Sequence, residues 1–247
     1  MLQSVNLALR DCPHVEAPSL CNHCSARRLS VCGSLADEAL ARLAVLAEPI
    51  EAEPDAVLVR EGDQASHLIN VTSGVVRVSK LLSDGRRQIV GFLFAGDFLG
   101  LAAGERYPFS AEAVDEVTAC RFRRPAYQAL LKDTPALEGA LLARASDDLR
   151  AAQEHMLLLG RKTALERVAS FLLDVSTRTE RAVGDGVLIP LPMTRSEIAD
   201  YLGLTIETVS RTVSRLKLRG VISLPSQRSA LIEQPDVLRA LSGSGED

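Results

Sequence analysis

The segment from Thr194 to Leu216 constrains the fold of this chain more than any other. Apolar residues recur there at helical spacing in two short runs, and Gly203 between them supplies a tight turn. Thr205 offers a hydroxyl N-cap to the second run. The apolar residues are Ile198, Ala199 and Leu202 in the first run and Ile206, Val209, Val213 and Leu216 in the second. This pattern predicts two short helices joined by a glycine turn, which is the helix-turn-helix arrangement.

Polar side chains remain on the outer face of the second predicted helix. In a helix-turn-helix that helix enters the major groove of DNA, where arginine can fork onto guanine, glutamate can accept from cytosine and serine is adaptable. At the start of the first helix, Thr194 and Arg195 are expected to bind phosphates and set the register. The alternative is an ordinary helical pair with a solvated polar face. The residues predicted to face the bases are Glu207, Ser210, Arg211 and Arg215.

This segment resembles the recognition helix of the CRP/FNR superfamily of bacterial transcription regulators, and the resemblance runs from about Cys21 to Ile232. The E-x-x-S-R signature of the family is present as Glu207-Thr208-Val209-Ser210-Arg211. The cAMP-receptor branch has glycine at the position of Ser210, so the chain resembles the FNR branch. The resemblance implies a homodimer that binds double-stranded DNA at a palindrome written TTGAT-N4-ATCAA, contacts RNA polymerase and controls anaerobic or microaerobic genes.

Composition sets wider limits on function. The 247 residues are enough for two domains, and a net charge of −4 argues against a uniformly basic coat for nucleic acid. Charge is uneven, because residues 161–232 hold 11 Lys and Arg against 7 Asp and Glu, a net +4 that leaves −8 on the remainder. No apolar run approaches a membrane span, and residues 1–13 lack a signal-peptide core, so a cytoplasmic protein without a membrane partner is expected.

The region from Ile50 to Arg123 breaks into short β-rich runs separated by turn residues, of which Asp84-Gly85 is a strong hairpin indicator. Short, evenly spaced strands predict a jelly-roll or barrel. The family resemblance implies the same roll as an effector domain, so the expected fold class is α+β, with a cyclic-nucleotide-binding-like roll ahead of a winged helix-turn-helix. The predicted strands are Val57–Arg60, His67–Thr72, Val75–Leu82, Gln88–Phe94 and Val117–Arg123.

A long helix is predicted from Pro135 to Leu159 and is expected to end at Gly160. One stripe of this helix alternates three and four residues, which is typical of a seam against a parallel partner helix. The alternative is that the stripe packs on its own domain. The family resemblance implies an acidic residue in this helix that disfavours the dimer when the cofactor is absent, and Glu154 resembles it. The predicted dimerisation residues are Leu142, Ala145, Leu149, Ala152, Glu154, Met156 and Leu159.

A second helix, capped by Thr163 and running to about Arg178, is predicted ahead of the helix-turn-helix. Two short strands around Pro225–Ser229 predict a small wing after it. The expected domains are a cysteine-containing segment (residues 1–34), the roll (35–134), the dimerisation helix (135–160), the winged helix-turn-helix (161–241) and a disordered tail (242–247).

Five cysteines stand at Cys12, Cys21, Cys24, Cys32 and Cys120, and three of them form a C-x2-C-x7-C triplet. Such loop spacing lets thiolates grip one metal ion or cluster, and Cys120 is the only further cysteine in the expected folded body. Residue chemistry alone leaves zinc, an iron–sulfur cluster and, for Cys120, an unligated buried thiol as alternatives. Disulfides are unexpected in a reducing cytoplasm.

The family resemblance implies a choice among these alternatives. FNR-type oxygen sensors hold a [4Fe–4S] cluster through three cysteines ahead of the roll and one in a late roll strand. The matching residues are Cys21, Cys24, Cys32 and Cys120, so the resemblance implies a [4Fe–4S] cofactor and oxygen sensing, with Cys12 outside the ligand set. FixK relatives without the triplet do not sense oxygen through a cluster. A cluster-free or zinc-stabilised regulator of the same family is the alternative function.

Two further function classes, a cAMP sensor and a cupin-like metalloenzyme, fit the residues poorly. A cAMP site needs a Gly-Glu pair followed by an Arg-Ser pair, and Gly104-Glu105 has no such partner in the stretch up to Ser110, so no cAMP binding is expected. A cupin-like metalloenzyme needs clustered histidines, whereas the four here are scattered at His14, His23, His67 and His155. We therefore expect no enzyme activity and no catalytic residues.

Overall fold

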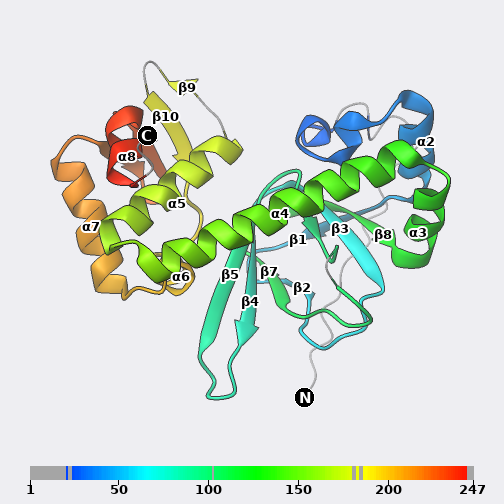
Figure 1. The fold of residues 1–247 in the computed structure, drawn as a ribbon, viewed down its shortest axis with the longest axis horizontal. Coiled ribbons are helices and arrows are strands. Elements are labelled where there is room, and N and C mark those ends of the chain that lie inside the picture. Colours follow the sequence, from blue (N-terminus) through cyan, green and yellow to red (C-terminus); the bar gives the residue numbers. More distant parts are fainter. Residues whose placement is uncertain (1–20, 22–23, 102, 180–181, 184–185, 244–247) are drawn as a thin grey trace. The chain divides into compact units, whose positions relative to one another are not determined.

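The computed structural model describes residue 21 and residues 24–101, 103–179, 182–183 and 186–243. Cys12, His14 and His23 lie outside the described residues, so the expectations for them stay untested. The chain divides into two compact units, residues 1–149 and 150–247, and the division falls inside the long helix α4 (Pro135–Arg161) (Figure 1). Among the described residues no helix is long and apolar enough to cross a membrane.

Two four-stranded antiparallel sheets form the roll of the first unit. The first sheet has the order β1-β8-β3-β6, with bounds Glu48–Ala52, Val117–Arg123, His67–Ser73 and Phe98–Leu99. The second has the order β2-β7-β4-β5, with bounds Val57–Val59, Ser110–Ala113, Val76–Leu81 and Arg87–Leu93. The predicted roll is confirmed, and each of the five predicted strands is present within a residue or two of its expected bounds.

The core of the roll follows from strand alternation, since successive side chains of a strand point to opposite faces of its sheet. One set of alternating residues faces inward between the two sheets and is buried. This cluster includes Ile50, Ile69, Val71, Leu99, Val117 and Ala119 from the first sheet and Val59, Val76, Val78, Ala111 and Ala113 from the second.

The outer face of the first sheet is covered by a second apolar cluster. Two 3₁₀ turns, η1 (Arg27–Leu29) and η2 (Val31–Ser34), lead into α2 (Asp37–Leu46), while α3 (Arg124–Lys132) follows the last strand of the roll. The Tyr127 ring lies edge-on to Phe122, with 5.3 Å between ring centroids. The buried members of this cluster are Val31, Leu35, Leu40, Leu43, Leu68, Phe98, Phe122, Tyr127, Leu130 and Leu137.

Helix α4 begins at the predicted Pro135 but runs through Gly160 to Arg161, so the prediction that Gly160 ends the helix was wrong. Glycine can adopt helical dihedrals at a modest cost, and the chain leaves the helix only where Thr163 begins to cap α5 (Ala164–Thr179). Within the first unit, the Arg144 guanidinium of α4 pairs with the buried carboxylate of Asp97. This ion pair fixes the early part of α4 on the roll.

The second unit is a winged helix-turn-helix, as the sequence predicts. Its helices are α5, α6 (Arg195–Leu202), α7 (Ile206–Leu218) and α8 (Pro235–Leu241). A sheet of order β11-β12-β10-β9 has the bounds Ile222–Ser226, Ser229–Ile232, Gly186–Pro190 and Ala182–Val183. The prediction of a disordered tail from residue 242 was wrong for Ser242. This residue is buried, and its carbonyl accepts a hydrogen bond from Lys162 Nζ at 2.8 Å.

Candidate functional site

The helix-turn-helix has the local geometry that its sequence predicts. Gly203 follows α6 in the left-handed conformation, with φ of 61°, and its N–H donates to the Ala199 carbonyl. Thr205 caps α7, because its hydroxyl accepts from the Thr208 N–H at 3.2 Å. The predicted apolar residues of both helices are buried except Ile206, which is 47% exposed at the first turn of α7.

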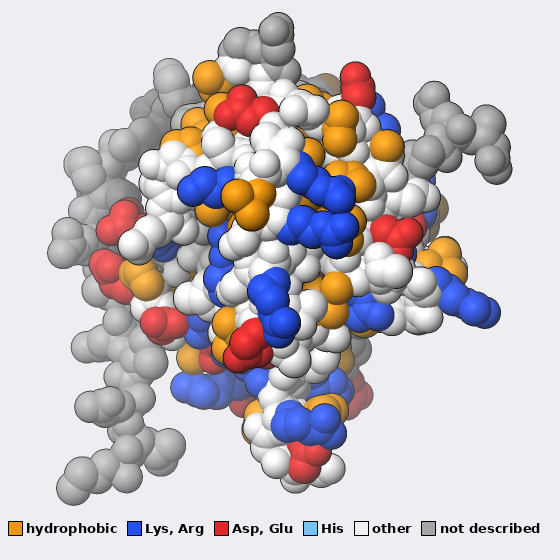
Figure 2. All heavy atoms as spheres, turned by 90° about the vertical axis from the view of Figure 1, so that its left-hand side faces the viewer, with side chains coloured by type: hydrophobic (Ala, Val, Ile, Leu, Met, Phe, Trp, Pro, Cys, Tyr) orange, Lys and Arg blue, Asp and Glu red, His pale blue; other side chains and the backbone are white. Residues whose placement is uncertain are grey.

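All four residues predicted to face the bases lie exposed on α7. Hydrogen bonds from its own backbone amide and from the Thr205 hydroxyl hold the pKa of Glu207 below its usual value, so it is an ionised acceptor at neutral pH. Arg211 Nε donates to the Glu207 carbonyl at 3.3 Å, and this hydrogen bond holds the Nε end of the guanidinium against the helix. Figure 2 looks onto the C-terminal helices and shows Lys and Arg side chains near the middle of this face.

The two residues predicted to bind phosphate differ in their surroundings. Thr194 caps α6 in a capping box, in which its hydroxyl accepts from the Glu197 N–H and the Glu197 carboxylate accepts from the Thr194 N–H at 2.7 Å. The Thr194 side chain is therefore first of all a helix cap. Arg195 is half-buried and lies in one surface hollow with Leu224 and Ser226 of the wing, so its guanidinium belongs to the same surface as β11.

Arg167 of α5 is a positioning residue that the sequence pattern did not reveal. Its guanidinium donates to three carbonyls that end helices or lie in turns: Lys162 at 2.9 Å, Leu202 at 2.9 Å and Leu159 at 2.8 Å. Carbonyls at helix C-termini lack intrahelical partners, and a cation there satisfies them and complements the helix dipole. Arg167 thereby ties the turn of the helix-turn-helix to the end of α4 within the second unit.

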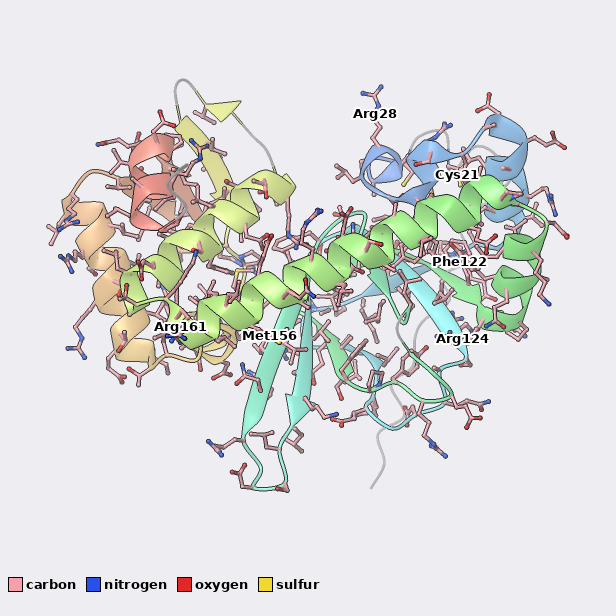
Figure 3. All side chains as sticks on the ribbon, viewed as in Figure 1. Cys21, Arg28, Phe122, Arg124, Met156 and Arg161 are labelled. Carbon is pink, nitrogen blue, oxygen red and sulfur yellow. The ribbon has the colours of Figure 1, made fainter. Side chains whose placement is uncertain are left out.

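A second candidate site is a cavity of about 320 Å³ beneath the N-terminal segment of the first unit. All four cysteines predicted as ligands line it: Cys21, Cys24, Cys32 and Cys120. Figure 3 labels Cys21 and Phe122, which contribute to the lining from the N-terminal segment and from β8. Three thiols from one short loop and one from a strand about 90 residues later thus open into a single space.

Three of the thiols that line this cavity, those of Cys21, Cys32 and Cys120, have raised pKa values. Burial raises the pKa of Cys21 and Cys32, and burial together with the charges of the other three cysteines raises that of Cys120 to about 12. A cationic guest would displace these protons and offset the mutual repulsion of the thiolates. Within the described residues, no three His, Cys, Asp or Glu side chains converge closely enough to hold a single metal ion.

The predicted seam is an exposed apolar stripe along α4. Leu142, Leu149 and Met156 are 68%, 61% and 64% exposed, and Ala145 and Ala152 between them are exposed as well. Leu159 is the exception, since it is half-buried. The alternative that this stripe packs on its own domain fails for the five exposed members, which leave a surface suited to a partner helix.

Glu154 does not belong to this stripe. It lies two residues from both Ala152 and Met156, which turns it about 160° from each around the helix. It lines a hollow of the second unit with Asp174 and Arg178 of α5. The neighbouring His155 stacks on the Tyr201 ring of α6, with 4.3 Å between ring centroids, and burial lowers its pKa. Glu154 therefore lies off the exposed stripe, on the side of α4 toward α5, and the meeting of two Glu154 carboxylates across a dimer seam stays a prediction.

Comparisons with known proteins agree with this architecture. Residues 49–134 match the family model of the cyclic nucleotide-binding domain, and residues 166–241 match that of the Crp-like helix-turn-helix domain. The nitrogen fixation regulation protein FixK of Azorhizobium caulinodans is 46% identical over 200 residues, which is 81% of each chain. The transcriptional activator protein FnrL of Cereibacter sphaeroides is 36% identical over 239 residues, which is 94% of this chain and 96% of that protein.

A solved structure gives the same result. FixK2 from Bradyrhizobium japonicum has a TM-score of 0.75 and 37% identity, over 81% of this chain and 99% of that one. These relatives are regulators of transcription and not enzymes. With an effector-type roll, a long helix carrying an exposed stripe, and a helix-turn-helix whose second helix exposes Glu207, Ser210 and Arg211, the chain belongs to the CRP/FNR family of DNA-binding transcription regulators.

Proposed function

We propose that this protein is an oxygen-responsive transcription activator that binds TTGAT-N4-ATCAA-like palindromes as a homodimer while a [4Fe–4S] cluster is bound. The observation that carries the proposal is the convergence of Cys21, Cys24, Cys32 and Cys120 on one cavity of a CRP/FNR-family roll. The resting state of the regulator would then be set by whether the cluster is intact, and its targets would be anaerobic or microaerobic genes.

The donor set and the space both suit such a cluster. Iron–sulfur clusters are held by four cysteine thiolates, and each thiolate binds a different corner, so the sulfurs surround the guest instead of meeting at one point. The N-terminal segment would contribute three of the thiolates that hold the cluster, and β8 of the sheet would contribute the fourth, Cys120. The cluster would supply a redox-sensitive link between the N-terminal segment and the roll, and the cysteines would exchange their protons for iron.

The DNA contacts follow from the exposed face of α7. Arg211 would donate to the guanine of TTGAT, Glu207 would accept from the cytosine paired with it, and Ser210 would contact the thymine step. A palindrome needs two copies of the reader, and the exposed stripe of α4 would supply the parallel seam between them. The hairpin turn between Leu82 and Arg86, closed by the Leu82 N–H and the Arg86 carbonyl at 2.8 Å, is our candidate surface for RNA polymerase.

Iron analysis tests the proposal directly. Protein purified without oxygen should be straw-brown and contain about four irons and four sulfides per chain, the content of one [4Fe–4S] cluster. Serine at any of Cys21, Cys24, Cys32 or Cys120 should abolish this content, whereas Cys12→Ser should retain it. Stoichiometric zinc without iron under strict anaerobiosis would refute the cluster and favour the second candidate function.

That second candidate is a zinc-stabilised or cluster-free regulator of the same family. Thiolates suit zinc as well as iron, but the cysteines that line the described cavity do not converge on one point as a single zinc ion requires. A cAMP sensor has less support from the sequence, because Gly104-Glu105 is not followed by an Arg-Ser pair in the stretch up to Ser110. The guanidinium of Arg106, next to Gly104-Glu105, donates to the Gly62 carbonyl at 2.6 Å.

A further inference from the structure

The outer face of the first sheet carries three residue pairs between β3 and β8, of which two are register pairs and the third lies where the register shifts after Val71. Leu68 lies opposite Phe122, and both belong to the apolar cluster under the helices. Thr72 and Thr118 share a hydrogen bond of 2.8 Å between their hydroxyls. Between these two pairs, Asn70 lies opposite Cys120. Leu68 and Phe122 pack in one apolar cluster, and Thr72 and Thr118 are joined by a hydrogen bond. Asn70 has no such hydrogen bond with Cys120.

Asn70 is a buried amide whose hydrogen bonds are not made within the described part of the chain. It is 3% exposed, and neither Nδ2 nor Oδ1 has a partner there. An amide side chain can donate two hydrogen bonds and accept two, and leaving these groups unpaired in the interior destabilises the fold. Asn70 is one of the residues that line the same cavity as the four cysteines, so a guest bound there would lie next to this buried amide.

We infer that Asn70 is a positioning residue for the cluster, whose Nδ2 donates a hydrogen bond to sulfur on the Cys120 side of the cavity. The inference rests on the proposed function, since it assigns to Asn70 a partner that is present only when the cluster is bound. A hydrogen bond from a neutral amide to an anionic sulfur is charge-assisted and stronger than one between neutral groups. Hydrogen bonds to the sulfurs are also a means by which a protein tunes the potential and retention of its cluster.

The chain offers a buried polar group for comparison. The Thr134 hydroxyl in the same unit is also buried without a partner, but Thr134 does not line the cysteine cavity. Thr134→Val therefore removes an unpaired polar group of the same kind without touching the proposed site. Asn70→Leu replaces the amide by an apolar side chain of similar volume. Asn70→Asp keeps the shape but presents a carboxylate to the thiolates, so its donor is lost and a repulsive charge is added.

The test uses full-length protein loaded anaerobically, with cluster loss to an iron chelator followed by visible absorbance and thermal unfolding followed on both loaded and metal-free forms. Asn70→Leu should load iron but release it about tenfold faster than wild type or more, as expected when a second-sphere partner is lost. Asn70→Asp should release it faster still, and Thr134→Val at the wild-type rate. Without metal, Asn70→Leu should unfold at a higher temperature than wild type, because its cavity no longer contains an unpaired amide.

Each outcome separates the inference from the proposed function. If wild type loads four irons and Asn70→Leu releases them at the wild-type rate, Asn70 is an ordinary water-bonded amide and the inference is wrong, while the cluster stands. If wild type loads no iron, the proposed function fails and the inference fails with it. Should Asn70→Leu not fold, the soluble Asn70→Asp variant decides, since unchanged retention there would also overturn the inference.

Discussion

At the scale of single residues, the proposed function assigns base reading to Arg211 of α7 and phosphate binding to Arg195 of α6. Arg211 is exposed in the middle of the helix, whereas Arg195 is half-buried beside the wing at the start of α6. A base-reading arginine contributes to the specific site alone, so Arg211→Ala should cost about 1–3 kcal/mol on the TTGAT palindrome and almost nothing on random DNA. A phosphate contact serves every sequence, so Arg195→Ala should weaken both and lower the salt dependence of binding.

Gel-shift titrations of both variants against specific and random duplexes over a range of salt concentrations measure these effects. An equal loss on the two duplexes for Arg211→Ala would make Arg211 a backbone contact and leave the half-site without support from this residue. Thr194 is a poor choice for the phosphate test, because its hydroxyl caps α6 and its removal would destabilise the helix by about 1 kcal/mol.

At the scale of elements, substitutions on the exposed stripe of α4 and on the face that carries Glu154 are expected to affect dimerisation differently. In a parallel dimer, equivalent residues of a seam face one another, so Ala152→Asp would bring two carboxylates together and should shift the loaded protein toward monomer. Glu154→Ala changes the face toward α5 and should leave dimerisation unchanged. Sedimentation or light scattering of both variants checks this pair. A stronger dimer from Glu154→Ala, together with an unchanged dimer from Ala152→Asp, would move the seam to the other face.

The elements that sequence patterns predicted are those with strong periodicity or clear caps. The five predicted strands contain runs of β-branched and aromatic residues, and Thr163, Thr194 and Thr205 all cap helices. The missed strands of the roll have weaker patterns: β1 contains Pro49 directly after Glu48, β6 has two residues, and β7 has the sequence Ser-Ala-Glu-Ala. These segments form strands because they pair with neighbouring strands. In β7, for example, Ala111 and Ala113 lie opposite Val78 and Val76 of β4.

Some residues of the candidate sites could be predicted from local sequence spacing, whereas others depend on contacts between distant parts of the chain. Spacing within one segment was enough to single out the cysteine triplet and the outward residues of α7. Asn70 and Arg167 gave no such indication, because their roles depend on neighbours far away in sequence. Asn70 is defined by the register that sets it opposite Cys120, and Arg167 by a turn 35 residues further along the chain. Glu154 resembles the family's acidic residue in sequence, but its angle on α4 places it away from the exposed stripe.

At the scale of the whole molecule, the cysteine cavity and the start of α4 share one apolar cluster. Leu137 of α4 is a buried member of this cluster, and Cys21, Cys32, Cys120 and Leu141 of α4 pack against it. The Arg144–Asp97 ion pair adds a second attachment between α4 and the roll. A change in how the N-terminal segment packs over the sheet can therefore bias α4 through contacts inside the first unit. The same helix then carries the exposed stripe and enters the second unit at Arg150.

Oxygen should therefore act on the dimer through α4. Under the proposed function, cluster-loaded protein should be dimeric and bind the palindrome, and air should shift it toward monomer as the cluster degrades, because loss of the cluster frees the packing that favours the seam. Light scattering and gel shift before and after exposure to air measure both effects. Cys120→Ser, which cannot hold the cluster, serves as the control and should give the same weak dimerisation with and without air. Equal dimerisation and operator binding by the loaded and air-treated wild type would refute the gate while leaving the DNA-binding assignment intact, since that rests on α7 and not on the cavity.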